Sequence, residues 1–194
     1  MQETEIKLYV PDLRAIEARL RELGATLAHA RVYEKNVRYD DASGGLSAAR
    51  RVLRLRQDDE VRLTYKDDGA AVDGGPWTRF EAEVTVEDFA TMEVILGRLG
   101  YHAYMVYEKY RTTWAFDGLE VMLDEMPYGN FVEIEGEGSR IMPLVGRLGL
   151  NDAPRMTASY GALFDRVKSR LGLSFDDLTF ANFAHIDVPL IALE

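Results

Sequence analysis

Glu3-Thr4-Glu5-Ile6-Lys7-Leu8-Tyr9 predicts a β-strand near the N-terminus of the 194-residue chain. Its charged residues alternate with less polar ones. Successive side chains of a strand point to opposite faces, so two carboxylates and one ammonium would share a face. One such strand fits an ordinary solvated sheet face. The pattern gains weight only if it recurs along the chain.

The same period-two alternation recurs in six later segments. They are 53–56, 61–66, 79–84, 109–112, 121–124 and 132–135. Their charged residues sort into basic strands and acidic strands instead of mixing. An open antiparallel sheet would carry these charges outward, whereas a closed barrel would carry them inward. The alternation alone leaves both arrangements open.

The chemistry of these charges favours a phosphate ligand with a metal ion. Arg side chains offer forked donors that suit phosphate oxygens, and Lys adds point charge. Neighbouring carboxylates would repel one another. Beside a polyphosphate they would be well placed to hold a hard divalent cation such as Mg²⁺ or Mn²⁺.

The ordered set of segments resembles the CYTH family of triphosphate tunnel metalloenzymes. The similarity begins with Glu3-x-Glu5-x-Lys7 and covers roughly residues 2–172. The other segments occur in the family's order: Leu53-Arg54-Leu55-Arg56, Leu63-Thr64-Tyr65-Lys66, Arg79-Phe80-Glu81-Ala82-Glu83, Glu108-Lys109-Tyr110-Arg111, Leu123-Asp124, Phe131-Val132-Glu133-Ile134-Glu135 and Ser159-Tyr160-Gly161-Ala162-Leu163. Glu3-x-Glu5-x-Lys7 alone would be a weak signal, but the ordered set is a strong one.

The resemblance implies an α+β fold, a closed eight-stranded antiparallel β-barrel with helices on the outside. Residues 1–172 would form this domain, and residues 173–194 a tail packed on it or on a partner chain. The implied metal ligands are Glu3, Glu5, Asp124, Glu133 and Glu135, with Asp124 either a ligand or an orienting residue. The implied triphosphate-binding residues are Lys7, Arg54, Arg56, Lys66, Lys109 and Arg111, with Glu81 and Glu83 on the same strand face. Glu3, Glu5, Lys7, Glu133 and Glu135 would form the catalytic set.

Strand 27–39 departs from the family pattern. Asn36 stands where relatives often carry Asp, and Arg38 where they often carry Tyr. These departures leave both positions without an assigned role. Lys35 is a lesser candidate for contact with the anion.

The resemblance implies a metal-dependent enzyme and leaves its reaction open. Hydrolysis of tripolyphosphate or a small organic triphosphate, such as thiamine triphosphate, is favoured because no separate adenine-binding motif is present. The alternative is a class IV adenylate cyclase that converts ATP to cyclic AMP and pyrophosphate. A third hypothesis is a non-catalytic module that binds polyphosphate or nucleotide.

Composition limits the remaining possibilities. A net charge of −10 argues against a general nucleic-acid binder, and the absence of Cys excludes thiolate metal sites. The chain shows neither a leader-like start nor an apolar run long enough for a bilayer, so a cytoplasmic protein without a membrane partner is expected. The sequence leaves a homodimer open.

The periodicity also predicts the helices and loops. Helices are expected from Asp12 to Gly24 and over 86–99, 140–148 and 157–171. Strands are expected over 27–39, 103–116, 119–124 and 130–136, with a hairpin over 52–66. Loops are expected over 41–49 and 67–76. Asp117-Gly118 predicts a tight hairpin turn.

Overall fold

The computed structural model describes residues 4–67, 70–71, 77–78 and 80–194 of the chain. The strands of its main sheet are β1 (Glu5–Val10), β2 (Thr26–Asp41), β3 (Val52–Gln57), β4 (Val61–Lys66), β7 (Glu81–Val86), β8 (Tyr101–Phe116), β9 (Leu119–Met126) and β10 (Gly129–Glu135). The short strands β5 (Ala70–Ala71) and β6 (Trp77–Thr78) pair separately. The helices are α1 (Leu13–Glu22), α2 (Gly45–Ala48), α3 (Phe89–Arg98), α4 (Gly138–Arg147), α5 (Tyr160–Leu171), α6 (Phe180–Phe183) and the 3₁₀ helix η1 (Leu190–Ala192).

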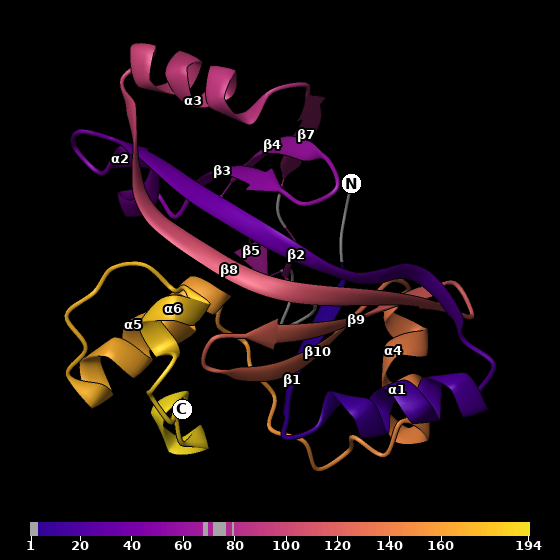
Figure 1. Ribbon diagram of the computed structural model, residues 1–194. Helices are drawn as coiled ribbons and strands as arrows, with labels where there is room; N and C mark the ends of the chain where they lie inside the picture. Colours follow the sequence, from indigo (N-terminus) through magenta and orange to yellow (C-terminus); the bar gives the residue numbers. More distant parts are fainter. Residues whose placement is uncertain (1–3, 68–69, 72–76, 79) are drawn as a thin grey trace. The chain divides into compact units, whose positions relative to one another are not determined.

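The main sheet is antiparallel, with the strand order β1-β10-β9-β8-β2-β3-β4-β7 (Figure 1). This confirms the predicted α+β class and the eight-stranded antiparallel sheet. Within the described residues, hydrogen bonds do not join the end strands β1 and β7. Closure into a barrel therefore stays a prediction.

The chain divides into two compact units. Unit 1 contains residues 33–108 and 176–179, and unit 2 contains residues 4–32, 109–175 and 180–194. The long strands β2 and β8 each contribute one half to each unit. Each unit is described by itself below.

Unit 2 buries the apolar face of its strands beneath two helices. Side chains from β1, β9 and β10 pack against α1 and α4, which lie along the same face (Figure 1). Ile6, Val132 and Leu144 are typical members of this core. Burial of each such side chain stabilises the fold by about 1.5–3 kcal/mol. The charged residues of these strands therefore occupy the other face.

Helix α1 forms as the sequence predicts. The Asp12 carboxylate accepts a hydrogen bond of 2.9 Å from the backbone N–H of Arg14 and caps the N-terminus. Ile16 and Leu20 lie one turn apart on the buried side. Gly24 follows the helix with φ of 81°, a conformation that glycine adopts without strain.

The turn between β8 and β9 fixes the pairing of two strands that carry site residues. Asp117 and Gly118 have φ angles of 49° and 75°. Positive φ at both positions is typical of a type I′ hairpin turn, as Asp-Gly predicts. The resulting register pairs Arg111 with Asp124.

Unit 1 contains a smaller core and one short helix that the sequence analysis missed. Val37, Tyr39 and Leu55 pack with Leu96 of α3. The prediction of a loop over 41–49 was wrong in part, because 45–48 form α2. Two consecutive carboxylates accept backbone hydrogen bonds around the start of this helix: Asp40 from Leu46 and Ser47, and Asp41 from Ser43 and Gly45. The other predicted loop, 67–76, lies largely outside the described residues.

The C-terminal residues contact both units. In unit 2, the Phe183 ring lies 5.9 Å from Phe164 and 5.4 Å from Phe175, measured between ring centroids. In unit 1, the Leu178 N–H donates to Val106 O at 2.8 Å, and its carbonyl accepts from Glu108 N at 2.9 Å. A domain boundary at residue 172 stays a prediction. In the described part of the chain, no helix has the length and apolar character needed to cross a membrane.

Candidate functional site

The predicted site residues fall into two groups, one in each unit. Unit 2 carries Glu5, Lys7, Lys109, Arg111, Asp124, Glu133 and Glu135. Unit 1 carries Arg54, Arg56, Lys66, Glu81 and Glu83. Glu3 lies outside the described residues. The groups are called the unit 2 face and the unit 1 face below.

Asp124 is the centre of the unit 2 face. Its side chain is fully buried, and both of its oxygens accept hydrogen bonds. Arg111 donates from Nε to Oδ1 and from Nη2 to Oδ2, each at 2.6 Å. Oδ2 also accepts from Lys109 Nζ at 3.1 Å and from the Tyr160 hydroxyl at 2.8 Å. A carboxylate has about two acceptor positions on each oxygen; three of these donors converge on Oδ2, whereas Oδ1 accepts from Arg111 Nε.

The electrostatics of this cluster keep Asp124 ionised. Burial alone would raise the pKa of its carboxyl group. Attraction to Arg111 and Lys109, with hydrogen bonds from Arg111 and Tyr160, instead holds that pKa well below its ordinary value. Burial, followed by the charges of Asp124 and Glu133, raises the pKa of Tyr160. Tyr160 is therefore a neutral hydroxyl that donates to a charged carboxylate.

Lys7 and Glu133 complete the buried part of the unit 2 face. They are register partners on β1 and β10, with Lys7 Nζ 3.3 Å from Glu133 Oε1. Arg111 Nη2 lies 2.5 Å from Glu133 Oε2 and thereby bridges Asp124 and Glu133. Lys7 Nζ also lies 4.3 Å from the centroid of the Tyr160 ring. A cation above an aromatic face is attracted to it, so Tyr160 also helps to hold Lys7.

Further along the same strands, a row of carboxylates crosses the sheet. Glu5 pairs with Glu135 across β1 and β10, and Glu135 pairs with Glu120 across β10 and β9. Like charges directly opposite one another are destabilising without a cation between them. Carboxylate oxygens are the preferred ligands of Mg²⁺ and Mn²⁺, so this donor set suits such an ion. Among the described residues, however, no three carboxylate or His side chains converge on one point that could hold a metal.

The unit 1 face contains two neighbouring arginines on β3. Arg54 contacts the Tyr107 hydroxyl at 3.1 Å through Nη1 and the Thr64 hydroxyl at 3.2 Å through Nη2. Arg56 Nε lies 3.3 Å from Asp58 Oδ2. The Glu83 carboxylate is more distant, 3.8 Å from Arg54 and 3.7 Å from Arg56.

Burial and a neighbouring like charge both act on Arg56. Burial, followed by repulsion from Arg54, lowers the pKa of the Arg56 guanidinium below its ordinary value. Glu34 and Asp58 act in the opposite direction but do not offset these effects. A bound anion would relieve this repulsion.

Lys66 and Glu81 form a tight pair at the other end of the unit 1 face. Their Nζ and Oε2 atoms lie 2.5 Å apart, and they are register partners on β4 and β7. Glu83 accepts a hydrogen bond of 2.7 Å from the Thr64 hydroxyl. Both carboxylates of β7 therefore contact polar residues of β4.

The structure adds residues that the sequence analysis did not select. Glu34, Asn36 and Arg38 share the face of β2 opposite the apolar core formed by Val37 and Tyr39. The prediction that Lys35 faces the anion was wrong, because Lys35 Nζ lies 5.3 Å from the Phe89 ring on the other face. The apolar residues Val37 and Tyr39 indicated this orientation, because every second residue of a strand points to the same face.

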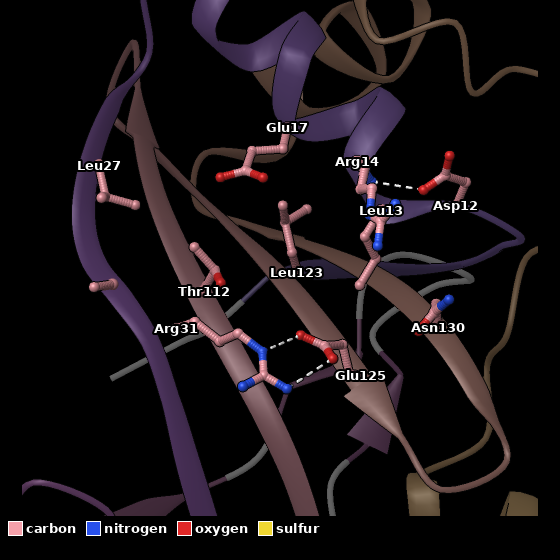
Figure 2. Close-up of a pocket in the computed structure, with 11 residues that line it drawn as sticks. Asp12, Leu13, Arg14, Glu17, Leu27, Arg31, Thr112, Leu123, Glu125 and Asn130 are labelled. Carbon is pink, nitrogen blue, oxygen red and sulfur yellow. Dashed lines mark hydrogen bonds and ion pairs between the residues drawn. The ribbon is translucent and has the colours of Figure 1, made fainter.

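A separate pocket of about 560 Å³ lies in unit 2, beside α1 (Figure 2). Leu27 and Leu123 contribute apolar surface, and Arg31 faces Glu125 across the lower part of the view. Arg31 donates to both Glu125 oxygens at 2.6 and 3.0 Å and lies 3.5 Å from the Tyr110 ring centroid. No predicted site residue is among the described residues that line this pocket.

Comparison with known proteins gives one curated relative and many similar folds. A Methanocaldococcus jannaschii protein named "Putative adenylate cyclase" is 27% identical over 137 residues, covering 70% of this chain and 77% of the relative. A Vibrio parahaemolyticus structure described as a "putative adenylate cyclase" matches with a TM-score of 0.74 at 18% identity, covering 85% of this chain and 98% of the other. A Hippeastrum structure matches with a TM-score of 0.61 at 21% identity, covering 90% of this chain and 98% of the other. Its description is a "Putative adenylyl cyclase" that "reveals a dominant" triphosphatase activity.

The family comparison covers most of the chain. The model of the CYTH domain matches residues 1–142, which include all but the late Ser-Tyr segment of the motifs given above. The chain belongs to the CYTH domain family.

Proposed function

We propose that the protein is a metal-dependent triphosphate phosphohydrolase. The observation that carries this proposal is the pair of neighbouring guanidinium groups of Arg54 and Arg56. They lie side by side on β3, with Glu83 3.7–3.8 Å from both groups and Asp58 3.3 Å from Arg56. Forked donors of this kind suit the non-bridging oxygens of a polyphosphate. Family membership supports the same ligand class.

The two faces have complementary roles in this proposal. Arg54, Arg56 and Lys66 bind phosphate oxygens, while Glu81 and Glu83 orient these cations. On the unit 2 face, Lys7, Lys109 and Arg111 are likewise proposed to bind phosphate oxygens. Of the two roles expected for Asp124, we propose that it orients, because its charge is already paired with Lys109 and Arg111. We further propose that the sheet closes into a barrel, as in a triphosphate tunnel.

Glu3, Glu5, Glu133 and Glu135 are the proposed ligands for Mg²⁺ or Mn²⁺. A divalent ion would supply charge neutralisation and would lower the pKa of a bound water. The chain's own cations bind and align the phosphoryl groups, which is most of what phosphoryl transfer requires of a protein.

Adenylate cyclase activity is the second candidate. The curated relative that is 27% identical is named "Putative adenylate cyclase". The description of the Hippeastrum structure assigns dominant triphosphatase activity to a protein named as a cyclase, which favours hydrolysis as the first reaction to test. The third candidate, a binding module, would retain triphosphate affinity without turnover. A cytoplasmic location stays a prediction.

A product assay separates the three candidates. Purified protein is incubated with tripolyphosphate, thiamine triphosphate or ATP, in Mg²⁺ and separately in Mn²⁺. Release of orthophosphate is the expected result, and the preferred substrate names the enzyme. Cyclic AMP with pyrophosphate would instead establish the cyclase. Tight binding without any product would establish the binding module.

Arg56→Ala should weaken tripolyphosphate binding about 10- to 100-fold. A hydrogen bond to a charged group contributes about 1.5–3 kcal/mol, and each 1.4 kcal/mol is tenfold in affinity. Calorimetric titration checks this result. Arg98→Ala is the matched control, because Arg98 is an exposed residue of the same unit on α3. Equal affinities for Arg56→Ala and wild type would remove Arg56 from the site.

A further inference from the structure

Strand β2 places a third arginine beside the two that the proposed function uses. Arg38 is the register partner of Arg54, and Asn36 is the register partner of Arg56. Directly opposite residues on antiparallel strands have Cα atoms about 4.5–5.5 Å apart, and like charges in such pairs are destabilising. The pairing of Arg38 with Arg54 therefore opposes folding unless something negative lies between them.

Three polar atoms of Arg38 and Asn36 have no hydrogen-bond partner among the described residues. Asn36 is fully buried, and neither its amide nitrogen nor its amide oxygen makes a hydrogen bond with any described residue. Arg38 Nε is also buried without a hydrogen-bond partner among the described residues. The guanidinium lies 5.5 Å from the centroid of the Tyr104 ring, which holds the cation without neutralising it.

Buried polar groups in native proteins nearly always have a partner, and each exception needs an explanation. A ligand that accepts hydrogen bonds from Arg38 and Asn36 would explain why their nitrogen atoms have no partner in the described part of the chain. Glu34 and Glu83 act on Arg54, whose pKa is raised above its ordinary value, yet the Asn36 amide and Arg38 Nε still have no hydrogen-bond partner among the described residues.

We propose that Arg38 and Asn36 form an additional phosphate-binding subsite on β2, next to Arg54 and Arg56. Arg38 donates to non-bridging phosphate oxygens, and the Asn36 amide nitrogen donates to the same phosphoryl group. The proposal rests on the proposed function, because it takes the ligand of the unit 1 face to be a polyphosphate. Both positions depart from the residues usual in the family, so the subsite is a property of this chain.

The test compares Arg38→Met and Asn36→Leu with Arg98→Met. Met keeps the unbranched apolar stem of the Arg side chain without its charge, and Leu keeps the branching and number of heavy atoms of Asn without its polar atoms. Arg98→Met makes the same change in net charge at an exposed position on α3. Tripolyphosphate affinity is measured by calorimetry, and Tm is measured with and without tripolyphosphate.

We expect Arg38→Met to bind tripolyphosphate at least 10-fold more weakly than wild type, and Asn36→Leu at least 3-fold more weakly. Without ligand, both variants should have a Tm equal to or above that of wild type, because repulsion or an unpaired amide has been removed. With ligand, their gain in Tm should be smaller than that of wild type. Arg98→Met should match wild type in affinity.

Two results would overturn the subsite. In the first, both β2 variants bind tripolyphosphate with the same affinity as the Arg98→Met control. The other is a loss of several degrees in Tm without ligand, which would assign Arg38 and Asn36 a purely structural role. Failure of the proposed function is distinguishable: a ligand other than polyphosphate would leave wild type itself without tripolyphosphate affinity, whereas a binding module would keep the same affinities without releasing orthophosphate. None of these measurements depends on turnover.

Discussion

Asp124→Asn should lower the free energy of unfolding by about 3–5 kcal/mol, the usual cost of breaking a buried ion pair by changing one partner. The carboxylate is fully buried and faces two cations, Lys109 and Arg111, together with the Tyr160 hydroxyl. Asn keeps the shape, but its NH₂ group replaces an oxygen that accepts from one donor (Oδ1) or from three donors (Oδ2). The buried cations would then lose their counter-charge. Denaturant titration measures the change.

The free energy of unfolding of Asp124→Asn should also depend less on pH in acid than that of wild type. The pKa of Asp124 is depressed in the folded protein, so its ionised form stabilises the fold above the ordinary carboxyl pKa of about 3.9. That contribution is lost as pH falls through the folded-state pKa. Wild-type stability should therefore fall more steeply with acid than that of Asp124→Asn. If the stabilities of wild type and Asp124→Asn fell equally steeply with acid, Asp124 would not be the ionised centre of the cluster.

Asp117→Asn is the matched control in the same unit and the same hairpin. Asp117 pairs with Arg140 at 3.6 Å, and both side chains are about half exposed or more. An exposed pair contributes about 0–1 kcal/mol. Asn also tolerates the left-handed backbone conformation of this turn position. A loss of stability as large as that of Asp124→Asn would contradict the buried-pair argument.

Alternation along the strands is what made most of the charged residues predictable. Lys7, Glu133 and Arg111 share one face because residues at every second position point the same way. The contacts of Asp124 were not predictable in this way. They depend on the register of β8 with β9 and on Tyr160, which reaches the face from a helix. The motif around Tyr160 was visible in the sequence, but its role depends on tertiary packing.

The error at Lys35 has a different origin. The family pattern assigns no role to Asn36 and Arg38, because both differ from the residues usual at these positions. The local pattern Val37 and Tyr39 was a better guide, since it places the apolar face of β2 at odd-numbered positions. Local periodicity here gave more information than comparison with the family's residues. Closure of the barrel could not be tested by periodicity, because an open and a closed sheet have the same alternation.

Glu5→Gln should reduce metal-dependent turnover by about 100-fold or more while leaving the fold intact. Glu135→Gln should have a similar effect on turnover. Loss of an anionic ligand weakens the binding of the divalent ion. The charge of such an ion stabilises the transition state by several kcal/mol, and each 1.36 kcal/mol is tenfold in rate. Initial rates measured over a range of Mg²⁺ and Mn²⁺ concentrations give the result. Glu22→Gln, an exposed change on α1, is the control and should retain wild-type turnover.

Stability without metal distinguishes a metal ligand from a structural carboxylate. Glu5 lies directly opposite Glu135, so Glu5→Gln removes a like-charge pair and should not lower Tm in a chelator. Divalent ions should raise the Tm of wild type more than that of the variant. Glu133→Gln should behave differently, because Glu133 already neutralises Lys7 and Arg111 and its loss leaves both cations short of a counter-charge. If Glu5→Gln instead lost stability in the chelator as Glu133→Gln does, Glu5 would be a structural charge, and the proposed metal site would lose a ligand.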